Sequence, residues 1–262
     1  MPLIDTGSVR TFYTDDGTGS PLVFIHGAGA SHDMWYPQIS YFSETHRVLT
    51  YDLRGHGQSS GSDERYTCTL YARDLQALLN GLDVRRPVLC GISFGGMIAQ
   101  EYAVTYGGLS GLALVDTAAS SALTLTEKIQ KAMAPPWLIR MMIKRMSMEA
   151  YADWSLKYVD VRSDIREYLK RLQMDMDRRE VIKLIEAIYS FKLVPLDRID
   201  IPTLIIVGER DRRAVHRHAR FMSEKIRDSK LVVIPQAGHV PNLESPDVFN
   251  QHLKEFLAER EL

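Results

Sequence analysis

Six short apolar runs, spread over most of the 262-residue chain, constrain its fold more than any other feature of the sequence. Most of them are continuous stretches of Val, Ile and Leu, a pattern typical of strands that are buried on both faces of a parallel sheet. Segments with helical periodicity, such as 71–82, 95–107 and 246–262, lie between or after the runs. This alternation of strand and helix predicts an open α/β sheet. The runs cover residues 21–27, 47–52, 87–93, 112–116, 203–211 and 230–239.

The alternation is interrupted in the middle of the chain. Residues 119–195 show no clear strand pattern, are rich in helix formers and contain seven of the eleven methionines. Pro135-Pro136 should separate two helices there. We therefore expect a helical insertion at 119–195 in a core made of residues 1–118 and 196–262. Near the N-terminus, the Asp16-Gly17 pair between two strand-like runs predicts a hairpin before the parallel part.

Composition excludes several classes of protein. Charged residues make up 25% of the chain and the formal net charge is -1, which argues against a nucleic-acid-binding protein. There is no apolar run of 18 residues, so we expect no membrane span. The first residues lack the basic and apolar regions of a secretory signal. Two cysteines, Cys68 and Cys90, are too few for a disulfide framework. A cytoplasmic enzyme or binding protein is the expectation, and the sequence carries no signal of its oligomeric state.

Ser93 stands in the stretch "CGISFGG" (90–96), which fits the pattern G-x-S-x-G. An apolar strand precedes it and a helix opened by small residues follows, which is the context that a nucleophile elbow requires. The turn is too sharp for side chains beside the serine, so Gly91 and Gly95 would clear the space. The helix N-terminus would add positive potential at the hydroxyl. The alternative is an ordinary serine that caps the helix.

A serine hydroxyl is a weak nucleophile without a general base. Among eight histidines, His239 is favoured because it follows the last apolar run, at the carboxyl end of a strand, where the active sites of open α/β sheets lie. An acid must then hold the imidazole in the required tautomer. Asp211 ends the run 203–211 and is the preferred candidate. Asp116 ends the run 112–116 and is the alternative. His216 and His218 are expected on a solvated helix face.

The stretch "HGAG" (26–29) follows the first apolar run, and its glycines allow backbone amides to bend inward. Acyl transfer needs such donors for the oxyanion. The backbone N–H groups of Ala28 and Phe94 are the predicted pair. We expect His26 to hold this loop by hydrogen bonds, and Asp52 to organise the turn that follows its own strand.

Taken together, these motifs resemble the α/β-hydrolase family. The chain order serine, aspartate, histidine is that of the family's triad. The resemblance implies an eight-stranded, mostly parallel sheet, with the helical insertion as a cap above the triad. Within the family, "GISFGGMIAQ" and the compact insertion look most like 3-oxoadipate enol-lactonases and small carboxylesterases. The matching stretches are "HGAG" (26–29), "YDLRGHGQS" (51–59), "GISFGG" (91–96), "GERD" (208–211) and "AGH" (237–239).

The sequence thus predicts a serine hydrolase that needs no cofactor or metal and cleaves a small-molecule carboxylic ester or lactone through an acyl-enzyme. Trp137, Met141 and Met142 are expected to line an apolar substrate pocket. A carbon–carbon bond hydrolase, a perhydrolase or an acyltransferase on the same triad remain alternatives. A binding protein on this fold without turnover is a further one.

Overall fold

A single sheet of eight strands forms the centre of the computed structural model, which describes residues 2–157 and 159–262. Its strand order is β1-β2-β4-β3-β5-β6-β7-β8, and every neighbouring pair from β4 to β8 is parallel. The predicted α/β fold with a mostly parallel sheet is confirmed. The strands are β1 (Leu3–Asp5), β2 (Arg10–Asp16), β3 (Pro21–Ile25), β4 (Arg47–Tyr51), β5 (Val88–Ile92), β6 (Gly111–Val115), β7 (Thr203–Gly208) and β8 (Ser229–Ile234).

The N-terminal hairpin differs from the sequence prediction. It joins β1 to β2 and does not turn at Asp16-Gly17. That pair links β2 to β3, which are not neighbours because β4 lies between them and pairs with both. Gly17 has a positive φ of 76°, and a Cβ there would lie 2.3 Å from the Ser43 carbonyl oxygen. The chain therefore turns at Gly17 close to the segment that leads into β4. As a result, β3 forms on the other side of β4 from β2.

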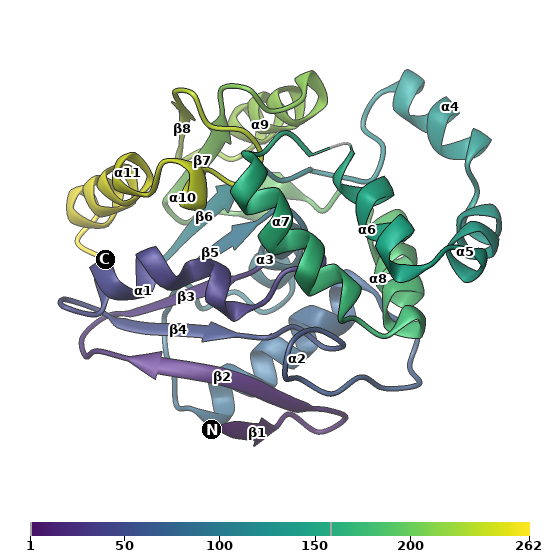
Figure 1. Ribbon diagram of the computed structural model, residues 1–262. Coiled ribbons are helices and arrows are strands. Elements are labelled where there is room, and N and C mark those ends of the chain that lie inside the picture. Colours follow the sequence, from purple (N-terminus) through teal and green to yellow (C-terminus); the bar gives the residue numbers. More distant parts are fainter. Residues whose placement is uncertain (1, 158) are drawn as a thin grey trace.

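Helices cover both faces of the sheet (Figure 1). One face packs against α2, α3 and α9, and the other against α1 and α11. No helix among the residues described is long and apolar enough to cross a membrane. The helices outside the insertion are α1 (Tyr36–Phe42), α2 (Cys68–Gly81), α3 (Phe94–Thr105), α9 (Arg213–Lys225), α10 (Pro241–Glu244) and α11 (Pro246–Glu259), with short 3₁₀ turns at His32–Trp35 and Leu196–Arg198.

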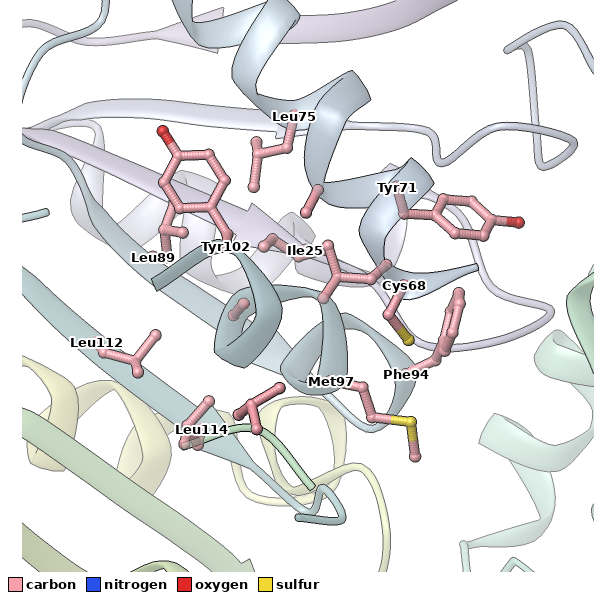
Figure 2. Close-up of a cluster of buried hydrophobic side chains, with 14 of the residues drawn as sticks. Ile25, Cys68, Tyr71, Leu75, Leu89, Phe94, Met97, Tyr102, Leu112 and Leu114 are labelled. Carbon is pink, nitrogen blue, oxygen red and sulfur yellow. The ribbon is translucent and has the colours of Figure 1, made fainter. Parts of the chain in front are cut away.

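The central strand β5 shows why the apolar runs are continuous. All five of its residues are buried. Leu89 belongs to the cluster that packs under α2 and α3, where Tyr71 and Phe94 also lie (Figure 2). Its neighbour Cys90 belongs to the cluster on the opposite face. Successive side chains of a strand point to opposite faces, so a strand covered on both sides needs an apolar residue at every position.

Five further helices lie between β6 and β7: α4 (Leu125–Met133), α5 (Pro136–Arg145), α6 (Met148–Leu156), α7 (Ser163–Met174) and α8 (Arg178–Ser190). The break at Pro135-Pro136 is confirmed, because α4 ends at Met133 and α5 begins at Pro136. Leu156 and Leu169, from α6 and α7, join the buried cluster of the sheet. In contrast, α4 buries none of its residues.

Candidate active site

Ser93 occupies the junction between β5 and α3, in a strained backbone conformation. Its φ of 53° and ψ of -114° lie outside the regions that L-residues prefer. A Cβ at Gly91 would lie 2.4 Å from the Gly95 carbonyl oxygen, and a Cβ at Gly95 would lie 2.2 Å from the Ile25 carbonyl oxygen. Both positions therefore require glycine for this turn. The Ser93 side chain makes no capping hydrogen bond, contrary to the alternative of an N-cap serine.

His239 bridges Ser93 and Asp211. Its Nε2 lies 3.0 Å from Ser93 Oγ, and its Nδ1 lies 2.7 Å from Asp211 Oδ2. Burial opposes ionisation of Asp211, but its hydrogen bond to His239 and the charge interaction with that ring hold the pKa of the carboxyl below its usual value. The three residues predicted for the triad thus come together in one hydrogen-bonded chain with an ionised carboxylate at its end.

Asp116, the alternative acid, lies behind Asp211. Its backbone has a positive φ of 40°, and its Oδ1 accepts a hydrogen bond from the Gly208 amide at 2.9 Å. Burial, the charge of Asp211 and a hydrogen bond to that carboxylate raise the pKa of Asp116 well above its usual value. Burial and the neighbouring charge thus favour the neutral form of Asp116. In this arrangement it is Asp211 that contacts His239.

Asp116, Asp211 and His239 also form the group of acidic and histidine side chains, within the described residues, whose ligand atoms lie close enough to hold an ion, all within 4.8 Å of one another. These atoms are engaged in other contacts. His239 Nδ1 bonds to Asp211 Oδ2, and Asp211 Oδ1 accepts from the Arg212 amide at 2.6 Å. Asp116 Oδ1 accepts from the Gly208 amide. We interpret the group as a hydrogen-bond relay.

The loop after β3 brings backbone amides beside Ser93. A Cβ at Gly27 would lie 3.5 Å from Ser93 Cβ, so this loop and the elbow are in contact. Neither the Ala28 amide nor the Phe94 amide has a hydrogen-bond acceptor in the described part of the chain. Phe94 is the first residue of α3, where an N–H has no partner within the helix. Two donors without an acceptor among the described residues therefore lie close to the elbow, one on the loop that contacts it and one at the start of α3.

A comparison with known proteins agrees with this geometry. The model of a family described as "Alpha/beta hydrolase family" matches residues 22–252. The chain belongs to the alpha/beta hydrolase family. It is 30% identical over 247 residues to 3-oxoadipate enol-lactonase 2 of Acinetobacter baylyi, covering 91% of this chain and 88% of that protein. It is 29% identical over 296 residues to a putative non-heme chloroperoxidase of Synechocystis sp., covering 98% and 100%.

Solved structures show the same relationship. A thermophilic esterase from Thermogutta terrifontis superposes with a TM-score of 0.89 at 25% identity, and the match covers 100% of both chains. The fold predicted from the sequence, and the resemblance to enol-lactonases and esterases, are confirmed.

Buried histidines hold the loops of this alpha/beta hydrolase in place. His26 Nδ1 lies 2.8 Å from the Gly27 carbonyl oxygen, and its Nε2 accepts from the Leu53 amide at 2.9 Å. His56 Nε2 accepts from the Gly29 amide at 3.2 Å. Burial lowers the pKa of His26 and lowers that of His56 to about 3, so both rings are neutral acceptors. His26 holds the loop as the sequence predicted.

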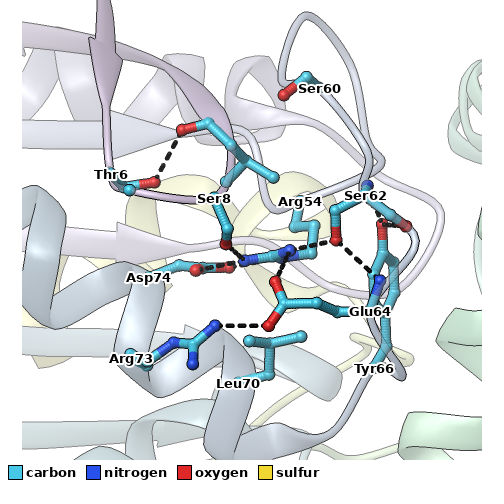
Figure 3. A network of polar contacts seen from close by, with 12 residues as sticks. Thr6, Ser8, Arg54, Ser60, Ser62, Glu64, Tyr66, Leu70, Arg73 and Asp74 are labelled. Carbon is cyan, nitrogen blue, oxygen red and sulfur yellow. Dashed lines mark hydrogen bonds and ion pairs between the residues drawn. The ribbon is translucent and has the colours of Figure 1, made fainter.

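The segment that follows β4 is fixed by two charged side chains. Asp52 Oδ2 accepts from the Gln58 amide at 2.8 Å, which confirms that Asp52 organises this turn. The buried Arg54 guanidinium donates to both carboxyl oxygens of Asp74, at 2.8 and 2.6 Å, and to Glu64 at 2.9 Å (Figure 3). This bidentate ion pair ties the segment to α2.

The prediction that His218 lies on a solvated helix face was wrong. His218 is buried and not on a solvated face: its Nδ1 accepts from the Ala119 amide at 3.1 Å. The helix α9 packs this face against the start of the insertion, and burial lowers the pKa of His218. His216, two residues earlier, lies near the surface.

A cavity of about 160 Å³ lies above Ser93. We call its lower side, formed by Ala28, Ser93 and His239, the floor. Its upper side, formed by Tyr151 and Ser155 of α6 and Gln173 of α7, is the roof. The remaining lining is apolar and includes Met34, Leu156, Leu169 and Ile185.

The structure corrects the predicted pocket residues. Trp137, Met141 and Met142 do not line this cavity, and their exposed fractions are 66%, 38% and 38%. The physical reason is that α5 turns Ile139 and Ile143 inward, into a cluster with α8, and thereby places these three side chains at the surface. The methionine that does line the cavity is Met34, which lies outside the insertion.

Sequence reasoning missed the polar residues of the roof. Tyr151 and Ser155 are four residues apart and therefore share one face of α6. That spacing was visible in the sequence. Nothing in the sequence indicated which face of α6 or α7 would be turned toward Ser93, and so nothing singled out Gln173.

Proposed function

We propose that this alpha/beta hydrolase cleaves small carboxylic esters or lactones through a covalent acyl-enzyme formed on Ser93. The observation that carries the proposal is the continuous hydrogen-bonded chain from Ser93 Oγ through His239 to Asp211. The similarity to an enol-lactonase and to an esterase supports the same class of substrate.

In the first half of the reaction, His239 Nε2 takes the hydroxyl proton as Ser93 Oγ attacks the carbonyl carbon. Asp211 orients the ring and stabilises its charged form. The Ala28 and Phe94 amides donate to the developing oxyanion. Collapse of the tetrahedral intermediate breaks the carbon–oxygen bond, and His239 returns the proton to the leaving alkoxide.

In the second half, a water molecule gives a proton to His239 and attacks the acyl carbon. The acid is released and Ser93 recovers its proton. The helices α4 to α8 would act as a cap that restricts the acyl group to the small cavity and excludes bulk water.

Ser93→Ala is the direct test. We expect it to lower kcat for a p-nitrophenyl ester by roughly 10⁴–10⁶-fold, as in other enzymes of this chemistry. Ser163→Ala, at an exposed position at the start of α7, is the matched control and should keep full activity. Circular dichroism would check that both variants fold. Retained ester turnover in Ser93→Ala would contradict the proposal.

A second candidate reaction shares the acyl-enzyme. Similarity to a putative non-heme chloroperoxidase favours hydrogen peroxide as an alternative acyl acceptor. Product analysis with added peroxide distinguishes the two, because a perhydrolase would release a peracid where a hydrolase releases the acid alone.

A further inference from the structure

The roof of the cavity contains polar groups that the reaction on Ser93 does not use. One of them is Gln173, a residue that is 5% exposed and lines the cavity. A Cβ at Gly29 would lie 2.7 Å from Gln173 Cγ and 3.0 Å from its Nε2. The amide of Gln173 therefore lies over the loop that carries Ala28, next to one of the two proposed oxyanion donors.

The orientation of this amide is set by a neighbour. The Ser155 hydroxyl, one helix away, shares its single proton between Gln173 Oε1 and the Ala152 carbonyl oxygen, which lies 3.0 Å from Ser155 Oγ. The other end of the amide, Nε2, carries two N–H groups. Nε2 donates to no acceptor in the part of the chain that the structure describes. Because Gln173 lines the cavity, a bound molecule that supplies an oxygen beside Nε2 would gain a hydrogen bond there.

Among the described residues that line the cavity, the titratable side chains are those of His239 and of hydroxyl residues such as Tyr151. The cavity's described lining residues include no Lys, Arg, Asp or Glu. An ionised carboxylate that entered it would lose its hydration and find no cation in return, which is strongly unfavourable. The volume of 160 Å³ corresponds to about five water molecules, and is smaller than the cavities that hold drug-sized ligands.

From these three observations we infer that the preferred substrate is a small, uncharged ester or lactone whose acyl chain carries one neutral oxygen, a hydroxyl or keto group, which accepts a hydrogen bond from Gln173 Nε2. Gln173 is then a specificity-determining residue, and Ser155 is a positioning residue that holds the amide. This inference rests on the proposed function, because it concerns the acyl group that Ser93 receives.

Three p-nitrophenyl esters of similar size test the inference: the butanoate, the 3-hydroxybutanoate (as both enantiomers) and the half-ester of succinate. The wild-type enzyme should hydrolyse one 3-hydroxybutanoate enantiomer with a kcat/KM roughly 3–10-fold above that of butanoate, the range of one neutral hydrogen bond. The half-ester, which carries a carboxylate, should be slower than butanoate by at least about 100-fold.

Gln173→Met keeps the length of the side chain and its packing over Gly29, but removes the donor. It should bring the ratio of kcat/KM for the hydroxylated ester over butanoate to about one, mainly by raising KM for the hydroxylated ester. Ser155→Ala, which frees the amide, should weaken the same preference. Gln130→Leu, at an exposed position on α4, is the matched control and should preserve the wild-type pattern.

Equal kcat/KM for the butanoate and both hydroxybutanoates, or a half-ester as fast as butanoate, would overturn the inference. So would a preference that persists in Gln173→Met. In each of these cases turnover still depends on Ser93, so the proposed function stands. Its own failure shows separately, as turnover in Ser93→Ala.

Discussion

The floor and the roof of the cavity are built in different ways. The floor consists of backbone turns at strand ends, where a positive φ at Ser93 and glycines at 91 and 95 leave the chain little freedom. The roof consists of side chains on helices, such as Gln173 and Ser155, whose directions depend on how α6 and α7 pack. The proposed catalytic groups thus lie in the part of the molecule whose backbone conformation is most restricted. The groups proposed to recognise the substrate lie in the roof, where one side-chain substitution can change the specificity.

Among variants that keep Ser93, the largest expected effect comes from the two carboxyls beneath the floor. Asp211→Asn should lower kcat by about 10⁴-fold, because an amide cannot hold the required tautomer of His239 or stabilise its charged form. Asp116→Asn keeps both a donor toward Asp211 and an acceptor for the Gly208 amide, so we expect less than a tenfold loss. Steady-state kinetics of the two variants on one ester make the comparison. Equal losses would mean that the two strand ends share the role of the acid.

A smaller effect should appear in the pH dependence of stability, through His56 below the floor. The folded protein keeps this ring neutral, with a pKa lowered to about 3, whereas the unfolded chain binds a proton near pH 6.5. Stability is therefore fully present above pH 6.5 and falls as the pH drops below it. Between pH 7.5 and pH 5 the contribution of His56 should fall by about 2 kcal/mol.

Urea unfolding of the wild type and of His56→Gln at both pH values would measure this difference. The variant should lose less stability on acidification, although His26 still titrates in it. Parallel losses in the two proteins would show that the His56 ring is not kept neutral in the fold.

The smallest effect is expected on the outer surface of the insertion. Trp137→Ala removes a side chain that is 66% exposed and does not line the cavity, so kcat/KM should change by less than about twofold. Leu169→Ala, inside the cavity, is the comparison and should raise KM and lower the free energy of unfolding by about 2–5 kcal/mol. A large loss of activity in Trp137→Ala would restore the pocket predicted from the sequence.

The sequence predicts the strands and the floor of the cavity better than it predicts the roof. The strands could be predicted from the sequence because burial on both faces requires an apolar residue at every position. The elbow could be predicted because its turn admits only glycine at positions 91 and 95, on either side of Ser93. Asp116 and Asp211 gave the same signal, an acid at a strand end, and only burial and distance separate them. The roof could not be predicted, because the helical patterns of α6 and α7 do not say which face is turned toward Ser93. In the same way, the pattern of α5 does not say whether Trp137 or Ile139 faces inward.

Two hydrogen bonds connect the insertion to the segment that carries His239. The His239 amide donates to the Asp160 carbonyl oxygen at 2.8 Å, and Glu244 accepts from the Arg162 amide at 3.0 Å. The segment around Asp160, between α6 and α7, is thereby fastened to the backbone that carries the proposed base. If the insertion opened by swinging this segment outward, it would draw His239 away from Ser93. A movement of the insertion that leaves this segment in place would preserve the base, and α4, which buries none of its residues, is far less constrained by packing.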